Sequence, residues 1–399
     1  MFTTTSAIAL PTTVTGSWPR PSWFQTNLER QPLSSRMNDL TYREQFTDAV
    51  SAVISDQERA GLDILTNGDY HHDEDLGGRS WLLYPVERLG GITPLDGDAT
   101  SDEWAYPPGT LLSEVMGGWR YPGVTGEVGE GLPLEFAKIW RIAQARTDRP
   151  VKFGAVSAQV AASVLTPHTD HYPADKHQLM WDMATAFNKE LRALAAAGCK
   201  AIQIEEPLIH FTAATSNDRG YIEFLIECFN HEVSGLEDVE VWAHTCWGNP
   251  NMQRVLEDTS YENSVEIYME RLNLDVWTIE AKDNTRPPLE LFAPYRGNFA
   301  RKVALGVVSH RSLQADTAEE VAGEIRRALE YIDVDHLVLS SNCGFGRQGF
   351  NRLIALYKAT AIAQGANIVR AELGLPTTQV RAADPALQVD VPTGVVGVA

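Results

Sequence analysis

The chain has 399 residues and a formal net charge of -20, from 53 acidic against 33 basic residues. A surface this acidic repels nucleic-acid phosphates and anionic membrane surfaces, so we expect neither a nucleic acid nor a membrane as a partner. Hydrophobic residues make up 44% of the chain and charged residues 22%, which indicates a globular protein with a large core and excludes a disordered one.

Apolar runs rich in β-branched residues alternate along the chain with segments of helical spacing, a pattern typical of β-α units around a parallel sheet. Eight runs predict strands, at residues 12–17, 63–69, 151–158, 201–207, 241–246, 276–282, 303–308 and 336–343. Helical spacing between them predicts helices at residues 42–60, 176–197, 221–231, 317–332 and 350–364. Eight strands predict a single (β/α)8 barrel, a TIM barrel, over residues 1–399.

Two segments stand outside this repeat. Between the second and third strands, residues 70–135 contain repeated Gly, Pro and aromatic residues, including GGWRYPGVTGEVGEG. Long irregular segments in compact domains usually act as lids or binding loops, so we expect this excursion over the face that carries the site. A small β-hairpin or an oligomer contact is the alternative. The C-terminal tail, residues 377–399, has little charge and no helix signal, and we expect it at the surface or between subunits of a homo-oligomer.

The N-terminal stretch and the cysteines indicate the compartment. The sequence MFTTTSAIALPTTV has no basic region followed by a long apolar stretch, and no window of about 18 apolar residues occurs in the chain. The four cysteines are too few for a disulfide framework in a protein of this length. We therefore expect a cytoplasmic protein with reduced thiols.

Potential metal ligands stand at the ends of three predicted strands. His244 and Cys246 end the fifth strand with one residue between them, so strand alternation directs both side chains to the same side. Glu280 closes the sixth strand and Cys343 the eighth, and strand ends converge on one face of a barrel. Imidazole, thiolate and carboxylate are ligands that zinc prefers. These four residues therefore predict a Zn²⁺ site.

A thiolate-rich zinc site has two chemical uses. A thiol with a pKa of about 8.5 is mostly protonated at neutral pH, and coordination to zinc deprotonates it, which makes a nucleophile. A weakly held ligand such as Glu280 could then loosen as the substrate sulfur arrives. The alternative is a structural zinc, because four protein ligands nominally close a tetrahedral site.

Seven segments of the chain resemble, in their order and spacing, the catalytic half of cobalamin-independent methionine synthase. They are TTVTGSWPR, GLDILTNGD, IQIEEP, HTCWGN, DVWTIEA, LGVVSHRS and SNCGFGR. The resemblance extends over most of the chain. It implies zinc on the four residues named above and methyl transfer to a small thiol, homocysteine, which becomes methionine. The implied donor is a methyl-folate or a methyl-corrinoid, the latter supplied by a corrinoid protein.

The resemblance also implies roles for four residues outside the metal set. Ser17 would contact the carboxylate of the substrate, Asp69 and Glu205 would hold its ammonium group, and His310 would transfer a proton, since a neutral leaving amine needs protonation. The family usually has Glu where this chain has Asp69, and Asp where it has Glu205. Each exchange changes the side chain by one methylene, which leaves the identity of the thiol open.

Full-length members of that family have an additional N-terminal barrel that helps to accommodate a polyglutamylated folate, so this chain is similar to the short, single-barrel forms. Another single-barrel relative, the epoxyalkane to coenzyme M transferase, uses zinc to activate a thiol against an epoxide. That reaction is the enzymatic alternative. A zinc-binding scaffold without transfer activity is the alternative that is not an enzyme.

Overall fold

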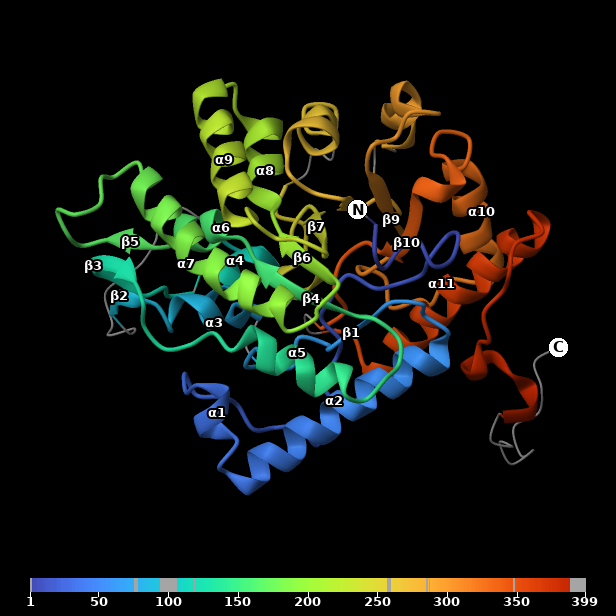
Figure 1. The fold of residues 1–399 in the computed structure, drawn as a ribbon, viewed down its shortest axis with the longest axis horizontal. Coiled ribbons are helices and arrows are strands. Elements are labelled where there is room, and N and C mark those ends of the chain that lie inside the picture. Colours follow the sequence, from blue (N-terminus) through green and yellow to red (C-terminus); the bar gives the residue numbers. More distant parts are fainter. Residues whose placement is uncertain are drawn as a thin grey trace.

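The centre of the molecule is a curled, parallel sheet (Figure 1). The computed structural model describes residues 2–74, 78–93, 106–117, 119–256, 260–284, 286, 288–346 and 349–387. The strands of the sheet are, in spatial order, β1 (Leu65–Thr66), β4 (Val151–Val156), β6 (Ala201–Glu205), β7 (Glu240–Thr245), β8 (Val276–Ile279), β9 (Lys302–Val308) and β10 (Leu337–Ser341). Neighbouring strands pair in parallel, which confirms the predicted α/β fold class.

The expected strand at residues 12–17 is present as a single bridge, from Thr12 to Leu339 of β10. The N–H groups of Asp63 and Ile64, which lead into β1, both donate to the Thr12 carbonyl at 3.0 Å. The segment therefore bonds to both outer strands of the sheet. The Thr13 N–H donates to the Leu339 carbonyl at 2.9 Å, but two residues later the Thr15 N–H donates to a side chain, the Ser341 hydroxyl, at 3.0 Å. The segment therefore does not continue as a strand along β10.

The expected strand at residues 63–69 is reduced to the two residues of β1. Gly68 and Asp69 have φ angles of 73° and 57°, in the left-handed region, so the extended backbone ends just before them. Glycine suits this conformation, and the turn leaves the Asp69 carboxylate at the end of the strand.

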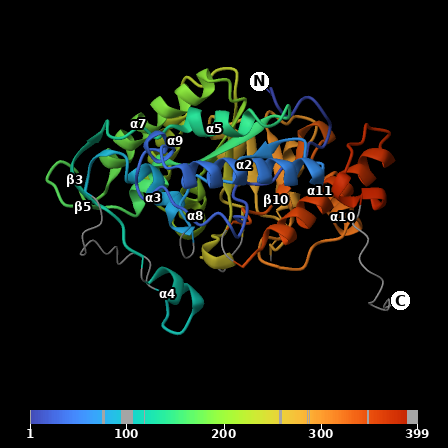
Figure 2. The same cartoon turned by 90° about the horizontal axis from the view of Figure 1, so that it is seen from below.

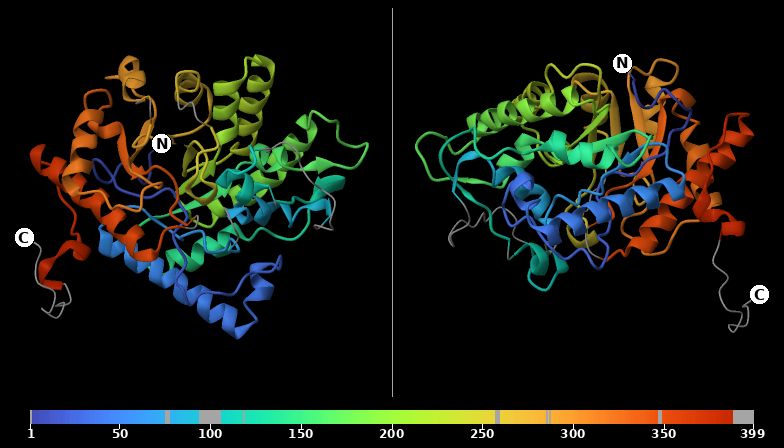
Figure 3. Two further views of the ribbon diagram at one scale, coloured as in Figure 1. Left: turned by 180° about the vertical axis from the view of Figure 1, so that it is seen from behind. Right: turned by 60° about the horizontal axis from the view of Figure 1, so that its bottom comes forward.

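Helices cover the outside of the sheet. They are α1 (Leu33–Arg36), α2 (Leu40–Ala60), α3 (Ser80–Val86), α4 (Leu111–Met116), α5 (Phe136–Gln144), α6 (Ala158–Ser163), α7 (His177–Ala196), α8 (Pro207–Thr215), α9 (Arg219–Glu232), α10 (Ala318–Ala328) and α11 (Arg352–Glu372). The predicted helices correspond to α2, α7, α9, α10 and α11, with shifted ends. The helices α2 and α11 pack side by side on one flank (Figure 3). Among the described residues, no helix is both long and apolar enough to cross a membrane.

Local sequence signals set the ends of the longer helices. Asp39 caps α2 by accepting hydrogen bonds from the N–H groups of Thr41 and Tyr42, and Gly61 ends that helix in the left-handed conformation. Thr317 and Glu320 form a reciprocal capping box at the start of α10. These residues satisfy backbone groups that a helix end leaves without a partner.

Apolar residues fill both sides of the sheet. Inside the curl, six buried residues form a small cluster of their own: Ile64, Ala201, Trp242, Val276, Ala304 and Val338. A much larger cluster lies between the strands and the surrounding helices. The inner cluster fills the interior near the starts of the strands, so polar groups gather at their carboxyl ends.

Between β1 and β4, the chain forms α3, α4, α5 and two further strands. The strands β2 (Gly90–Thr93) and β3 (Gly123–Gly129) pair antiparallel, and β3 pairs in parallel with β5 (Thr166–Pro167). The helix α4 projects from the body of the molecule (Figure 2) and contacts the short helix η3 (Pro250–Met252) that follows β7. Residues 75–77, 94–105 and 118 of the predicted excursion, and residues 388–399 of the predicted tail, lie outside the described residues.

Two fully buried carboxyl groups stabilise the connections around α8 and α9. Glu206 accepts a hydrogen bond from the Ile209 N–H at 3.0 Å, and Glu232 accepts one from the Ala158 N–H at 2.9 Å. Burial raises the pKa of Glu206 to about 7. Burial also raises the pKa of Glu232 well above its usual value, and the charge of Glu206 raises it further. Both groups therefore favour the protonated form in the folded chain.

We predict that Glu232→Gln increases the free energy of unfolding at pH 8 and changes it little at pH 5, because the amide is neutral at both pH values whereas the buried carboxyl group favours its protonated form. A carboxyl group whose pKa is raised by folding stabilises the fold below its unfolded pKa, and that contribution is lost as the pH rises through the folded pKa. Urea unfolding at the two pH values measures the difference. Glu227→Gln, on an exposed position of α9, is the control; an equal gain at both pH values would contradict the prediction.

Candidate metal centre and active site

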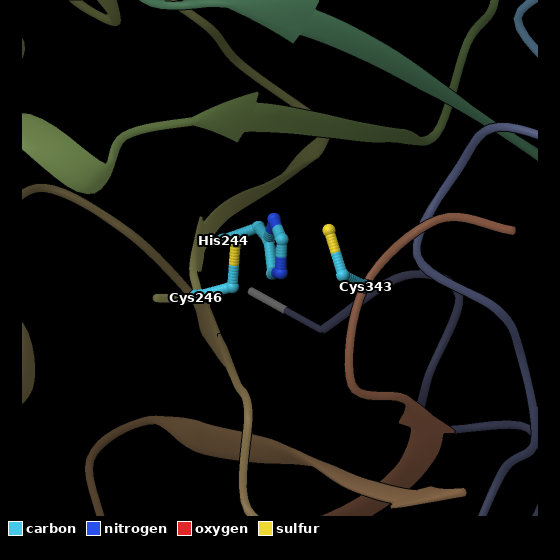
Figure 4. A group of neighbouring side chains, drawn as sticks. All are labelled: His244, Cys246 and Cys343. Carbon is cyan, nitrogen blue, oxygen red and sulfur yellow. The ribbon is translucent and has the colours of Figure 1, made fainter. Parts of the chain in front are cut away.

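His244, Cys246 and Cys343 meet at the carboxyl ends of β7 and β10. Their candidate ligand atoms all lie within 4.8 Å of one another, and the three side chains are buried. Figure 4 shows the imidazole and the two thiols pointing toward one another. One imidazole and two thiols in a buried, compact group match the donor set and the size of a tetrahedral zinc site. The residues present therefore fit the metal that the sequence predicts.

Strand alternation accounts for this convergence. Trp242 belongs to the apolar cluster inside the sheet, so His244 and Cys246, at successive spacings of two residues, point to the same interior side. Cys343 follows β10, which lies away from β7 in the order of the sheet, and the curl of the sheet brings the two strand ends together. A flat sheet would keep these groups apart.

Glu205 contacts one nitrogen of the His244 ring. The two residues pair in register across β6 and β7, and a Glu205 Oε2 atom contacts His244 Nδ1. The other ring nitrogen, Nε2, lies 3.1 Å from the carbonyl O of Asn342, the residue before Cys343. A carboxylate on one nitrogen orients a histidine so that the other nitrogen is available to a metal.

The electrostatics of His244 reflect the same contacts. Burial alone lowers the pKa of His244, but the negative charges of Glu205 and Cys343 outweigh burial and raise the pKa to about 9. For the Cys246 thiol, the hydrogen bond with Cys343 and burial raise the pKa well above its usual value. Without a cation the His244 imidazole and the Cys246 thiol favour their protonated forms at neutral pH, so an ion that binds here must displace protons.

Glu280, the fourth predicted ligand, lies in a neighbouring network. Arg311 donates to both carboxylate oxygens, from Nε to Oε1 at 3.1 Å and from Nη2 to Oε2 at 2.9 Å, and the Trp247 N–H donates to Oε2 at 3.0 Å. Glu280 also groups with Asp283 and His310, with candidate ligand atoms within 4.8 Å. Its role as a zinc ligand stays a prediction. Sequence reasoning missed Arg311, although it directly follows His310 in the segment LGVVSHRS.

His310 is completely buried at the end of β9. Burial lowers its pKa well below the usual value, with a further contribution from the positive charge of Arg311. These surroundings therefore favour the neutral form of the imidazole.

A cavity opens beside the three converging side chains. Its wall consists mainly of apolar and aromatic residues, and its lining includes Trp81, Met116, Trp119, Tyr121, Phe211, Glu205, His244, Cys246 and Cys343. The first four of these residues come from the segment between β1 and β4, so part of that segment walls the cavity. A largely apolar cavity with a few polar groups at one end is typical of a small-molecule site.

Ser17 and Asp69, two of the predicted substrate residues, line a second, more polar hollow together with Arg20 and Gly346. Gly16 allows Asp69 to approach, because a Cβ atom at residue 16 would lie 2.8 Å from Asp69 Oδ2. The Ser17 hydroxyl accepts a hydrogen bond from the Gly346 N–H at 3.2 Å, in the loop that carries Cys343. The third predicted substrate residue, Glu205, faces the first cavity.

Comparison with known proteins shows the family. Residues 10–83 and 108–364 match the family model described as the catalytic domain of cobalamin-independent synthase. The chain belongs to the cobalamin-independent methionine synthase family. A methionine synthase of Sulfurisphaera tokodaii is 28% identical to this family member over 370 residues, which cover 91% of the present chain and 94% of that protein. The corresponding protein of Saccharolobus solfataricus is 27% identical and covers the same share of the chain, with 96% of its own length.

Solved structures agree with this assignment. A B12-independent methionine synthase from Shewanella sp. W3-18-1, in complex with selenomethionine, superposes with a TM-score of 0.72 and 26% identity, covering 92% of this chain and 99% of the other. A chain described as a putative vitamin-B12 independent methionine synthase from Listeria monocytogenes superposes with a TM-score of 0.62 at 19% identity, covering 89% and 96%. At that identity the second likeness shows the fold alone.

We predict one zinc ion per chain in protein purified under reducing conditions, and at least a tenfold loss of zinc affinity in Cys343→Ala, because the variant removes one of three converging donors. Zinc content and competition with a chromophoric chelator measure both quantities. Cys199→Ala is the matched control, since Cys199 is also a buried, free cysteine and lies outside the group of three. A wild-type chain with far less than one zinc, or equal zinc affinity in the Cys343→Ala variant, would contradict the prediction.

Proposed function

We propose that the protein is a zinc-dependent methyltransferase that transfers a methyl group to the thiol of homocysteine and forms methionine. The observation that carries the proposal is the meeting of His244, Cys246 and Cys343 beside a largely apolar cavity. Support comes from the relatives named methionine synthase, which align over nearly their full length.

When bound to His244, Cys246 and Cys343, zinc supplies a site that keeps the substrate sulfur as a nucleophilic thiolate. We propose Glu280 as a further residue that would hold the zinc, and that would give way to the substrate thiol. Arg311 and the Trp247 N–H give its carboxylate an alternative place, with three hydrogen bonds.

We propose that the polar groups of the two hollows hold the amino-acid part of the substrate. Asp69 and Glu205 would accept hydrogen bonds from its ammonium group, and Ser17 would donate to its carboxylate. In the transfer step, the sulfur lone pair forms a bond to the methyl carbon as the bond from that carbon to the donor breaks. His310 would relay the proton that the substrate thiol loses to a leaving amine.

The proposed donor is a methyl-folate or a methyl-corrinoid, the latter presented by a corrinoid protein. Trp81, Trp119 and Tyr121 in the cavity wall support a donor with a flat ring system, because aromatic side chains pack well against such rings. We further propose that the described parts of the segment at residues 70–135, which supply Trp81, Trp119 and Tyr121 to the cavity wall, cover the site while the donor is bound.

We predict that the chain methylates homocysteine in an assay that crosses methyl-folate, methyl-corrinoid and epoxide donors with homocysteine and coenzyme M. X-ray absorption at the zinc edge should show an additional sulfur ligand when homocysteine is added. Alkylation of coenzyme M by an epoxide, without methylation of homocysteine, would replace the proposal with the epoxyalkane transferase reaction. A zinc spectrum that no small thiol changes would indicate a scaffold without transfer activity.

We also predict that Asp69→Asn raises KM for homocysteine at least tenfold and leaves zinc content unchanged, because a hydrogen bond to a charged group contributes about 1.5–3 kcal/mol. Asp48→Asn, on the exposed surface of α2, is the matched control. Binding of 4-mercaptobutanoate, which lacks the amino group, should be the same in wild type and variant. Equal weakening of both thiols would show that Asp69 does not recognise the ammonium group.

A further inference from the structure

A lysine lies inside the curled sheet, directly among its apolar side chains. Lys152 of β4 is 1% exposed, and its Nζ atom lies 4.4 Å from the centre of the Trp242 ring, a member of the inner apolar cluster. Burial of an ammonium group costs several kcal/mol unless nearby groups compensate for the lost water. The buried ammonium group of Lys152 therefore needs polar partners inside the sheet.

The Lys152 ammonium starts a chain of hydrogen bonds that ends on His244. It donates to Gln203 Oε1 at 2.5 Å, and Gln203 Nε2 donates in turn to Glu205 Oε1 at 2.5 Å. The other oxygen of Glu205 contacts His244 Nδ1. Gln203 Nε2 also lies 3.2 Å from the Thr15 carbonyl. The four side chains come from the neighbouring strands β4, β6 and β7, so each link is supported by the sheet itself.

The chemistry of the end groups determines the direction of this chain. An ammonium group only donates hydrogen bonds, and an ionised carboxylate only accepts them. The amide of Gln203 must therefore turn its oxygen to Lys152 and its NH₂ group to Glu205. Without the lysine, Gln203 Oε1 would lose its donor inside the sheet, and the amide would be held only by the two acceptors of its NH₂ group, the Glu205 carboxylate and the Thr15 carbonyl.

The charges agree with this arrangement. Burial raises the pKa of Glu205, but His244, Gln203 and Lys152 together outweigh burial, and the pKa is lowered overall. Burial lowers the pKa of Lys152 to about 7, against the opposing effect of Glu205 and Asp69. The carboxylate thus stays ionised in a place where burial alone would favour its protonated form.

We propose that Lys152 is a positioning residue for the metal centre: through Gln203 it holds Glu205 in the orientation that directs the His244 ring toward the two thiols. This inference rests on the proposed function and adds a residue to it that touches neither the substrate nor the metal. A positioning role accounts for the presence of a lysine at a place where burial of its charge is unfavourable for folding.

The test compares Lys152→Met, which keeps the length of the side chain and removes its donor, with Gln203→Met and with the double variant. Loss of an outer partner of a metal-binding histidine typically lowers metal affinity 10–100-fold, so we expect about a tenfold loss of zinc affinity in each single variant. The double variant should lose no more than either single variant, because both substitutions interrupt the same chain. The visible spectrum of the Co²⁺-substituted protein should change in the same three variants.

Lys302→Met is the matched control. Lys302 is also a buried lysine of the sheet, and it donates to the Thr5 carbonyl at 2.8 Å, away from the chain of hydrogen bonds to His244. The zinc affinity and the Co²⁺ spectrum of the Lys302→Met variant should equal those of the wild type, even if the variant is less stable.

Wild-type zinc affinity in the single variants, or losses that add up in the double variant, would overturn the proposal. If Lys152→Met does not fold, Gln203→Met decides alone, because it keeps the lysine and still interrupts the chain. A wild-type protein that binds no zinc would instead refute the proposed function, and this inference with it.

Discussion

The alternation of side chains along a curled parallel sheet is the constraint on which the candidate site depends. Residues two apart on one strand share a face, so Trp242 and His244 point inward along β7, and Cys246 follows in the same direction just beyond its end. Trp242 packs in the apolar cluster near the starts of the strands, and His244 and Cys246 lie at the carboxyl end of β7. The curl then brings Cys343 of a distant strand to the same point.

Three buried ionisable side chains around the candidate site each have a specific partner. Glu205 contacts His244, and Arg311 donates hydrogen bonds to both carboxylate oxygens of Glu280. The ammonium of Lys152 meets an amide oxygen and an aromatic face. Removing one member of such a pair leaves the other charged and unsolvated, which costs more than the pair contributes. The site is therefore an interdependent network, in which residues that never touch a ligand set the geometry of those that would.

The family assignment and the geometry bear on different parts of the proposed reaction. Membership of the cobalamin-independent methionine synthase family rests on a match over most of the chain, and it supports the thiol and the methyl group. The apolar, aromatic wall of the cavity bears on the donor. Of the two acidic residues predicted to bind the substrate, Glu205 lines the apolar cavity and Asp69 lines the more polar hollow. The proposal that Asp69 and Glu205 both bind the ammonium group of the substrate is therefore the part that a comparison of thiols with and without that group addresses most directly.

Much of the fold and site could be predicted from the sequence, because the information is local. Apolar runs rich in β-branched residues predicted strands, helical spacing predicted α2, α7, α9, α10 and α11, and the short spacing in His244-Thr245-Cys246 predicted two donors on one face. The shortened strands were missed, since left-handed turns at Gly68 and Asp69 and a side-chain acceptor at Ser341 arise only when the segments meet. Tertiary structure alone decided that Glu280 pairs with Arg311 and that Glu205 contacts His244. It also decided that Lys152 connects to Glu205 through Gln203. The partner of a buried charge depends on which strands become neighbours, and that choice is made by the whole sheet rather than by any segment of the chain.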